Sequence, residues 1–376
     1  MIYLNNAASS WPKPEIVRKT AAQALEALPV GQYRSSVSSD AEDILHDTRT
    51  RLGILLGVRE PDRIFFSSGA TESLNLILQG LQIPAAQIIT TVTEHNSVLR
   101  PLYNLTGDAG QPVLLPCDRD GYVPPEALEK EAAGGKARVF VMNHCSNVTG
   151  SLQDAAAFGE IAHRYGLLFV LDCAQSAGCL PIEGDDWGVD ALAFTGHKSL
   201  LGVQGTGGFW LRRGLRLRPL LYGGTGRDSV RLRYEDTMPP DYEAGTRNAP
   251  GIAALGAAAS FLISRGLPHI AAAERTLRAY ATEILSGLPR LRLLSVDGRP
   301  HGPVLSMVSD LLSPADLAYI LQNSYGIVTR AGLQCAPLVH GAIGSGAAGT
   351  LRISFSPFTQ ESEIDALADA LREILS

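Results

Sequence analysis

The chain has 376 residues, of which 45% are hydrophobic and 19% charged, which excludes a disordered protein and predicts more than one small core. Its 32 basic and 38 acidic side chains give a formal net charge of −6, which argues against nucleic-acid binding, because phosphate contacts need surplus positive charge. The sequence shows neither a signal peptide nor the roughly 20 apolar residues of a membrane span, so no membrane contact is predicted.

Cysteines occur at positions 117, 145, 173, 179 and 335. Their number is odd and no pair has CxxC spacing, so we predict neither a disulfide framework nor a metal site. A reducing, cytoplasmic compartment is therefore the expected location.

The predicted elements begin with an N-terminal arm that carries Pro12 and Pro14. Between about residues 60 and 215, short apolar runs of the kind found in buried strands alternate with helical patterns. We predict seven strands, at Ile64–Ser67, Ile88–Thr91, Val113–Leu115, Val139–Met142, Leu167–Leu171, Ala191–Phe194 and Gly208–Leu211. Helices are predicted at Thr71–Leu81 and at Asp154–Tyr165, where Asp154 caps the start and Gly166 stops the helix. This alternation predicts an α/β fold with a mostly parallel sheet covered by helices on both faces.

The last third predicts a smaller α+β domain. A helix begins at Ser313-Pro314, points Leu317, Ile320 and Leu321 inward, and ends at Gly326. Strands are predicted at Ile327–Thr329 and Leu351–Phe355, followed by an amphipathic helix, Glu361–Leu375, whose apolar stripe holds Ile364, Leu367, Leu371 and Ile374. We predict a large domain over residues 15–255. The small domain is expected to combine residues 256–376 with the arm, residues 1–14.

Lys198 has the most unusual setting of the five lysines, which contrast with 27 arginines. It follows an apolar strand and precedes a glycine-rich turn, whereas the other lysines lie in ordinary polar or helical contexts. A lysine at a strand end can lose its charge through desolvation and become an amine nucleophile. Taken alone, this stretch favours an exposed loop lysine near a tight turn.

Asp172 lies at the carboxyl end of the apolar run Leu167–Leu171, 26 residues before Lys198. Ligands of open α/β sheets bind outside these strand ends. A lysine that forms a Schiff base and an aspartate that pairs with a pyridinium nitrogen are the protein groups that pyridoxal phosphate requires. Capping of the next segment is the alternative role for Asp172.

A third motif, Ser68-Gly69-Ala70-Thr71, joins a strand to a helix. Small residues and a hydroxyl at a helix N-terminus form an anion site that suits a phosphate, although serine and threonine also cap many helices. No GxxxxGK[ST] motif occurs, which favours a cofactor phosphate over a nucleotide.

Five motifs together resemble the class-V aminotransferases, and most closely their cysteine desulfurase and selenocysteine lyase branch. The motifs are Gly69-Ala70-Thr71-Glu72, Glu94-His95-Asn96, Asp172-x-Ala174-Gln175, Thr195-Gly196-His197-Lys198 and Gly245-Thr246-Arg247-Asn248. The resemblance extends over essentially the whole chain. It implies the fold-type-I architecture of pyridoxal-phosphate enzymes, with a seven-stranded, mostly parallel sheet in the large domain.

The resemblance also implies a role for each matched residue. Lys198 would bind pyridoxal 5′-phosphate covalently, Asp172 would hold the pyridine nitrogen and Gln175 the ring oxygen, and His95 would stack on the ring and assist proton transfer. The phosphate would be bound by Ala70, Thr71, Thr195 and His197, and by Thr246 of the neighbouring subunit in a homodimer. Asn147 would lie near cofactor and substrate, and Arg352 would bind the substrate carboxylate, unless it is a strand residue that faces water.

Cys335 distinguishes the possible reactions. In the resembling desulfurases a cysteine on this loop attacks the substrate sulfur and becomes a persulfide, and a thiolate is a competent nucleophile for that step. The family often has histidine immediately before this cysteine, whereas this chain has Gln334, which removes a candidate acid or base. His340 is either a substitute for it or a surface residue. The other four cysteines are interpreted as core residues.

The sequence therefore predicts a desulfurase that converts L-cysteine to L-alanine and passes the sulfur to an acceptor, for which a protein is one candidate. The alternatives are a selenocysteine lyase and an aminotransferase or β-eliminating lyase with the same cofactor. An alternative of another class is a non-catalytic sulfur carrier or partner-binding module, for which the Lys198–Asp172 pair would be unnecessary.

Overall fold

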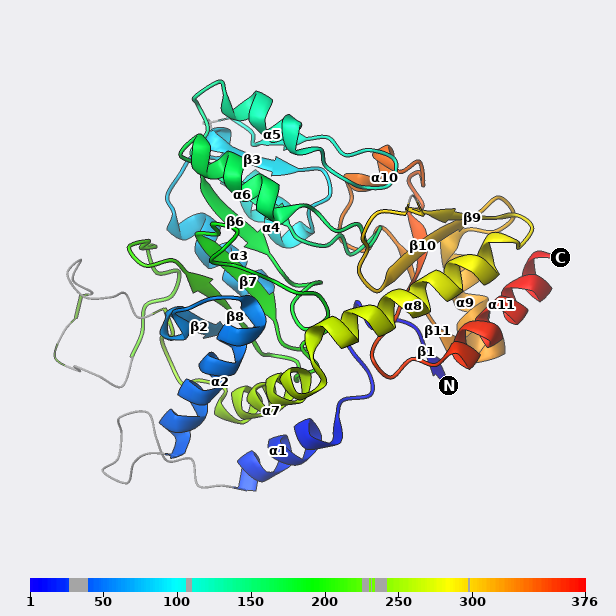
Figure 1. Cartoon of the computed structure of the whole chain (residues 1–376), viewed down its shortest axis with the longest axis horizontal. Coiled ribbons are helices and arrows are strands. Elements are labelled where there is room, and N and C mark those ends of the chain that lie inside the picture. The colour runs from blue at the N-terminus through cyan, green and yellow to red at the C-terminus, as the bar shows by residue number, and fades with distance from the viewer. Residues whose placement is uncertain (27–39, 106–109, 225–229, 231, 234–241, 297) are drawn as a thin grey trace.

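A computed structural model describes residues 1–26, 40–105, 110–224, 230, 232–233, 242–296 and 298–376. Figure 1 shows a large sheet flanked by helices and a smaller domain beside it, with both chain termini at the smaller domain. The large sheet has the strand order β2-β8-β7-β6-β5-β3-β4. These strands span Ile64–Ser67 (β2), Ile88–Thr91 (β3), Val113–Leu115 (β4), Val139–Asn143 (β5), Leu168–Asp172 (β6), Ala191–Thr195 (β7) and Gly207–Leu211 (β8).

All seven predicted strands are confirmed, each to within one residue at either end. Strand β8 runs antiparallel to β2 and β7, and the remaining neighbours are parallel. The carboxyl ends of β3, β5, β6 and β7 therefore lie along one edge of the sheet. That edge is where ligands bind in sheets of this kind.

Helices cover both faces of the large sheet. One face packs against α1 (Glu15–Glu26), α2 (Asp40–Leu56), α5 (Pro125–Ala132), α6 (Ala155–Arg164) and α7 (Ala249–Arg265). The other face packs against α3 (Ala70–Gly80) and α4 (Asn96–Asn104). The predicted cap of α6 is confirmed, because the Asp154 side chain accepts a hydrogen bond from the Ala157 N–H. Every residue of β5 is buried, as expected for a strand covered on both faces.

The smaller domain contains an antiparallel sheet of order β12-β13-β10-β9. Its strands are β9 (Leu291–Leu294), β10 (Val304–Ser309), β12 (Arg330–Gly332) and β13 (Thr350–Ser354), and its helices are α8 (Leu267–Ser286), α9 (Pro314–Tyr325), α10 (Val339–Ala342) and α11 (Glu361–Leu375). The predicted start and end of α9 are confirmed, with Ser313 as N-cap and Gly326 left-handed at φ +68°. Ile320 is only half-buried, whereas Leu317 and Leu321 are fully buried. Strands β9, β10 and β12 were not predicted.

The N-terminal arm links the smaller domain to the edge of the large sheet. Strand β1 (Ile2–Tyr3) pairs in parallel with β11 (Ile327–Val328), and Leu4 is buried in the core of the smaller domain. Farther along, the Ser10 N–H donates to the His197 carbonyl at 3.0 Å. The arm thus reaches the loop that carries Lys198.

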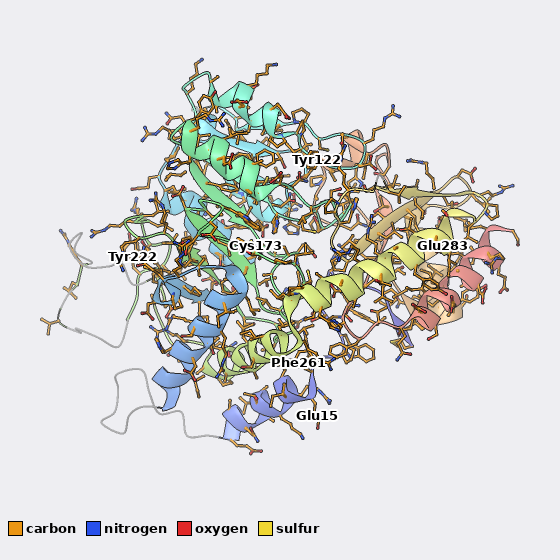
Figure 2. The ribbon with its side chains drawn as sticks, viewed as in Figure 1. Glu15, Tyr122, Cys173, Tyr222, Phe261 and Glu283 are labelled. Atoms are coloured by element: carbon orange, nitrogen blue, oxygen red, sulfur yellow. The ribbon has the colours of Figure 1, made fainter. Side chains whose placement is uncertain are left out.

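Helices α7 and α8 connect the two parts of the chain. Helix α7 packs on α1 and α2, whereas α8 packs on β9 and α11. Near the end of α7 lies Phe261, which is labelled in Figure 2. It stacks on Phe358 of the loop before α11, with ring centroids 6.1 Å apart. The domain boundary between residues 255 and 256 stays a prediction.

Within the described ranges no single helix is long and apolar enough to cross a bilayer. The α7–α8 pair passes that test by length and composition only, and the two helices are bent by 81° relative to each other.

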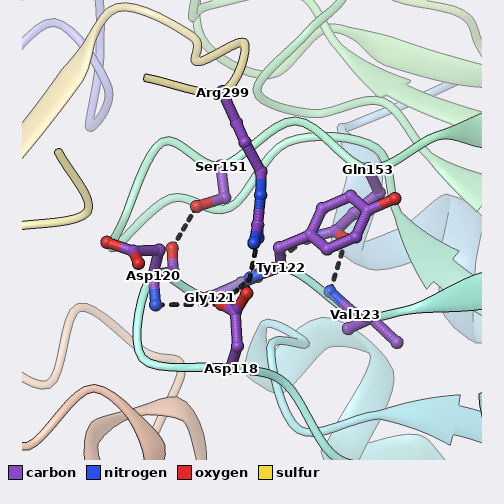
Figure 3. Close-up of polar contacts among 8 residues, drawn as sticks. All are labelled: Asp118, Asp120, Gly121, Tyr122, Val123, Ser151, Gln153 and Arg299. Atoms are coloured by element: carbon purple, nitrogen blue, oxygen red, sulfur yellow. Dashed lines mark hydrogen bonds and ion pairs between the residues drawn. The ribbon is translucent and has the colours of Figure 1, made fainter. Parts of the chain in front are cut away.

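A polar loop beside the sheet also joins the two domains. The Asp118 carboxylate accepts hydrogen bonds from the Asp120 and Tyr122 N–H groups and pairs with Arg299 of the smaller domain (Figure 3). Gln153, which follows β5 in the chain, also contacts this loop (Figure 3). Its carboxamide accepts from the Val123 N–H and donates to the Gly121 carbonyl. These contacts fix the loop without involving the sheet edge.

Candidate active site

A cavity of about 180 Å³ lies at the carboxyl ends of β3, β5, β6 and β7. Nine of the sequence-predicted residues line it: Ala70, Thr71, His95, Asn147, Asp172, Gln175, Thr195, His197 and Lys198. They come from segments up to 128 residues apart, and the parallel strands bring them together at one edge. The remaining three predicted residues, Thr246, Cys335 and Arg352, do not line this cavity.

Lys198 and Asp172 both line the cavity and interact electrostatically with each other. Asp172 is the last residue of β6 and its Oδ1 accepts a hydrogen bond from the Ala174 N–H at 2.9 Å. Burial raises the pKa of Asp172, while the Ala174 N–H and Lys198 oppose that change. Burial lowers the pKa of Lys198 to about 8, although Asp172 acts in the opposite direction. A substantial fraction of Lys198 is therefore a neutral amine near pH 8, as a nucleophile requires.

The start of α3 forms the anion-binding end of the cavity. The first N–H groups of a helix lack partners within the helix, and those of Ala70 and Thr71 lie at this end. Glu72 occupies part of the site, because its Oε2 accepts from the Ser68 N–H at 2.7 Å and from Ser68 Oγ. Gly207 lets β8 approach closely, since a Cβ there would meet Gly69 Cα at 2.5 Å. His197 Nδ1 is buried and has no hydrogen-bond partner within the described chain.

His95 caps α4 and faces the cavity. Its Nδ1 accepts a hydrogen bond from the Ser97 N–H at 3.0 Å, which places the ring proton on Nε2. Burial, together with Lys198 and Arg330, lowers the pKa of His95 to about 4. The ring is therefore neutral at physiological pH, which suits stacking on another ring.

Arg352 lies on β13 and is only 1% exposed, so it is not a strand arginine that faces water. Its Nη1 donates to the Asn147 carbonyl at 2.8 Å and its Nη2 to Asn5 Oδ1 at 3.1 Å. Its Nε has no partner, and no carboxylate of the described residues pairs with the guanidinium. Burial and Arg330 lower its pKa to about 9. A buried cation without a counter-ion is a favourable site for an anionic group.

Cys335 lines a second cavity, of about 370 Å³, between α3 and α4. Thr71, His95 and Ser97 line both cavities, so the second opens beside the first. Arg330 Nη2 lies 3.7 Å from the Cys335 Sγ. The thiol is thus next to a cation, and Lys198 and Arg352 lie close enough to interact electrostatically with it.

Gln334 and His340 have different surroundings from those considered in the sequence. Gln334 is 3% exposed and its side chain binds Thr350 of β13 instead of facing a cavity. Because the Gln334 side chain is directed at β13, it would not act as an acid or base at the substrate. His340 is also 3% exposed, so it is not a surface residue. Its Nε2 is 3.1 Å from the Leu333 carbonyl and its Nδ1 is 2.7 Å from Ser345 Oγ, so it supports the loop from behind.

Four further residues have surroundings that the sequence did not predict. Gln175 donates Nε2 to the Ala7 carbonyl of the N-terminal arm at 3.0 Å, which leaves one amide N–H for another acceptor. Thr246 is exposed and lines neither cavity. Cys145 is buried as expected, but it also lines the first cavity. Lys13 is less ordinary than its sequence context indicates: its Nζ donates to Ser10 Oγ and the His197 carbonyl, and burial lowers its pKa to about 8.

Two residues near the cavities were given no functional role from the sequence. Arg330, five residues before Cys335, contacts its thiol, and a basic residue close to a candidate nucleophile was a signal that could have been used. Glu94 is fully buried beside Asn143, and its Oε1 accepts from Thr91 Oγ1 and from the Asn143 N–H and side chain. Burial raises its pKa to about 8. No group of three or more histidine, cysteine, aspartate or glutamate residues suited to a metal ion occurs among the described residues.

Comparison with known proteins agrees with this geometry. The model of the class-V aminotransferase family matches residues 2–367. The chain is 32% identical over 404 aligned residues to a probable cysteine desulfurase of Aeropyrum pernix, covering 100% of this chain and 95% of that protein. It is 30% identical to the cysteine desulfurase CsdA of Escherichia coli, covering 100% and 94% of the two chains. The apo structure of a cysteine desulfurase from Thermococcus onnurineus NA1 has a TM-score of 0.89 and 29% identity, with 100% and 94% coverage.

The match with the family model over nearly the whole chain agrees with the arrangement of strands and cavity residues. The architecture is that of the fold-type-I enzymes, as the sequence predicted. The protein belongs to the class-V aminotransferase family.

Proposed function

We propose that this protein is a pyridoxal 5′-phosphate-dependent cysteine desulfurase that converts L-cysteine to L-alanine and carries the sulfur as a persulfide on Cys335. The observation that carries the proposal is the position of the Cys335 thiol. It lies 3.7 Å from Arg330 Nη2, in a cavity that shares Thr71, His95 and Ser97 with the cavity of Lys198 and Asp172. A nucleophile is thus beside the groups that suit the cofactor.

The residues of the first cavity fit pyridoxal phosphate. Lys198 offers an amine of lowered pKa for the aldehyde, and Asp172 offers a carboxylate for the ring nitrogen. The start of α3, with Thr195 and the unpaired Nδ1 of His197, suits the phosphate. The remaining N–H of Gln175 suits the ring oxygen, and the neutral His95 ring suits the ring face. When bound, the cofactor supplies an electron sink that stabilises negative charge on the substrate.

The protein's own groups bind the substrate and move its proton. Arg352 binds the substrate carboxylate, because it is a buried guanidinium with an unpartnered Nε. Asn147, whose carbonyl accepts from Arg352 Nη1, keeps that guanidinium in place. Lys198 in its neutral form takes the proton from the substrate Cα. Asp172 holds the ring nitrogen of the cofactor in its protonated form.

In the sulfur step, the Cys335 thiolate attacks the sulfur of the substrate. An S–S bond forms and the Cβ–S bond breaks, and the electron pair of the broken bond stays with the carbon skeleton. That skeleton takes up one proton at Cβ, Lys198 returns its proton to Cα, and L-alanine is released, while Cys335 keeps the sulfur as a persulfide. Two molecules of an acceptor thiol then return Cys335 to the thiol by forming a disulfide and sulfide. The second cavity offers such an acceptor a route to Sγ.

We also propose a homodimer in which Thr246 of one subunit reaches the phosphate site of the other. The exposure of Thr246 and its absence from both cavities support this arrangement. Mixing a Thr246→Ala variant with a Lys198→Ala variant tests it. Shared sites predict that mixed dimers contain one site with both substitutions and one intact site, so that activity returns after subunit exchange.

The decisive test of the reaction is Cys335→Ser. This variant should bind pyridoxal phosphate as the wild type does and should form neither persulfide nor sulfide from L-cysteine, because a serine hydroxyl is a poor nucleophile toward sulfur. Sulfide and alanine are measured with a thiol reductant, beside parallel assays with L-selenocysteine and with L-alanine plus a keto acid. Undiminished sulfide release would favour simple β-elimination. Activity confined to selenocysteine would identify a lyase, and amino-group transfer alone would identify an aminotransferase.

A further inference from the structure

We propose that Gln334 is a positioning residue, whose buried carboxamide holds the Cys335 loop against β13 and thereby fixes the thiol for attack on the substrate sulfur. This inference rests on the proposed function for its catalytic consequence. The juxtaposition of Gln334 with Thr350 does not depend on that function.

The carboxamide of Gln334 makes a two-point contact with one residue. Its Nε2 donates to the Thr350 carbonyl at 2.9 Å, and its Oε1 accepts from Thr350 Oγ1 at 3.1 Å. Gln334 and Thr350 are 3% and 0% exposed, so water does not compete for these bonds. The Thr350 carbonyl can only accept, which fixes the amide orientation with nitrogen toward it. An ionised carboxylate in this place would face that carbonyl with a lone pair and could not make the bond that the carboxamide makes.

The contact is needed because the loop has an unfavourable backbone conformation. Gln334 and Cys335 have φ values of +45° and +61°, a left-handed region that non-glycine residues rarely adopt. Two such residues in succession persist only where surrounding contacts hold them. Gly349 contributes to the close packing, since a Cβ there would meet the Gly332 carbonyl at 2.1 Å.

Two further hydrogen bonds connect the same loop to the active site. Asn147 Nδ2 donates to the Gln334 carbonyl at 2.6 Å, and the Asn96 N–H at the start of α4 donates to the Cys335 carbonyl at 2.7 Å. Asn147 also holds Arg352, so the carboxylate-binding and sulfur-binding groups share one support. If the Gln334 contact is lost, the strained backbone can relax and Sγ moves away from Arg330. Arg352 retains its contacts to Asn147 and Asn5.

This arrangement gives a reason for histidine at the same position in similar enzymes. The Nε2–H of a histidine is as far from the backbone as Nε2 of a glutamine and can donate to the same carbonyl. Position 334 thus requires a side-chain N–H that reaches the Thr350 carbonyl, and it does not require an acid or a base. Leucine and methionine fill the space and supply no donor.

The test compares Gln334→Leu, Gln334→Met and Gln334→His with Thr350→Val. We expect Gln334→Leu and Gln334→Met to lower kcat for alanine formation at least tenfold while KM for L-cysteine changes less than threefold. Gln334→His should restore kcat to within threefold of the wild type. Thr350→Val, which removes the hydroxyl and keeps the carbonyl, should have an intermediate effect. Hydrogen exchange of peptides covering residues 93–100 and 330–337 should rise at least fivefold in Gln334→Leu, with and without cofactor.

The matched control is Gln153→Leu. Gln153 is a buried glutamine like Gln334, but it holds a different loop (Figure 3). Its carboxamide accepts from the Val123 N–H and donates to the Gly121 carbonyl. Its exchange effect should be confined to that loop. Unchanged exchange at residues 330–337 in Gln334→Leu, or equal loss of kcat in Gln334→His and Gln334→Leu, would overturn the proposal. Should the wild type lack desulfurase activity, the exchange measurements still decide the positioning role.

Discussion

The edge of the large sheet and the Cys335 loop are built in different ways. At the sheet edge, Asp172 and Lys198 follow directly from buried strands, so chain direction alone places them together. The Cys335 loop depends on contacts from three distant segments: Asn96, Asn147 and Thr350. The positions of Asp172 and Lys198 are therefore kept by any change that leaves the strands intact. The loop, in contrast, depends on single hydrogen bonds that hold a strained backbone.

This difference predicts that substitutions at the edge alter how the cofactor is attached or activated, whereas substitutions near the loop leave the cofactor unaffected and alter substrate binding or the sulfur step. Lys198→Ala should have the largest effect, with activity lowered on the order of 1,000-fold or more, because both the covalent link and the base are lost. Borohydride reduction followed by peptide mass analysis should detect a phosphopyridoxyl adduct at Lys198 in the wild type. An adduct on Lys13, the other lysine whose pKa is lowered, would instead assign the covalent link to Lys13.

Asp172→Asn should retain cofactor and lower turnover by about 10- to 150-fold, because an amide cannot keep the ring nitrogen protonated. The range corresponds to about 1.5–3 kcal/mol for a hydrogen bond to a charged group. Alanine formation and the visible spectrum of the bound cofactor are measured together. Turnover equal to that of the wild type would mean that Asp172 only accepts the hydrogen bond from the Ala174 N–H and has no catalytic role.

Arg352→Lys belongs to the loop side of the comparison. It should leave cofactor binding unchanged and raise KM for L-cysteine about tenfold, because a lysine cannot form the two parallel bonds of a guanidinium. Initial rates over a range of L-cysteine concentrations supply KM, and cofactor content is determined on the same samples. A change in kcat alone would argue that Arg352 does not bind the substrate carboxylate.

The last effect concerns stability, through Glu94, which is buried beside Asn143 at the end of β5. Its pKa is raised from 4.5 to about 8 by burial, so between these values the folded protein keeps a proton that the unfolded chain loses. The free energy of unfolding therefore falls as pH rises through this range, by up to about 1.4 kcal/mol per pH unit. Glu94→Gln removes this dependence. Urea unfolding should show the variant gaining stability relative to the wild type between pH 5.5 and pH 8, and parallel curves would contradict the assignment.

Much of the large domain could be predicted from the sequence because its signals are local. Buried parallel strands are continuous apolar runs, and each of the seven was found to within one residue. The positions of Asp172 and Lys198 follow from the same signal, since each comes directly after its strand. Strands β9 and β12 were missed because they are short, and β10 was missed because Ser306 and Ser309 interrupt its apolar run.

The sequence by itself determined which chemistry-bearing residues occur and where the large sheet's strands lie, because these depend on neighbouring residues. Only the tertiary structure decided what Gln334, Arg352 and the N-terminal arm do. Gln334 binds Thr350, Arg352 is buried against Asn5 and Asn147, and Ala7 of the arm takes one N–H of Gln175. Each contact joins residues between 16 and 347 positions apart. No local periodicity encodes such pairs, since hydrogen-bonding partners are selected by the packing of whole elements.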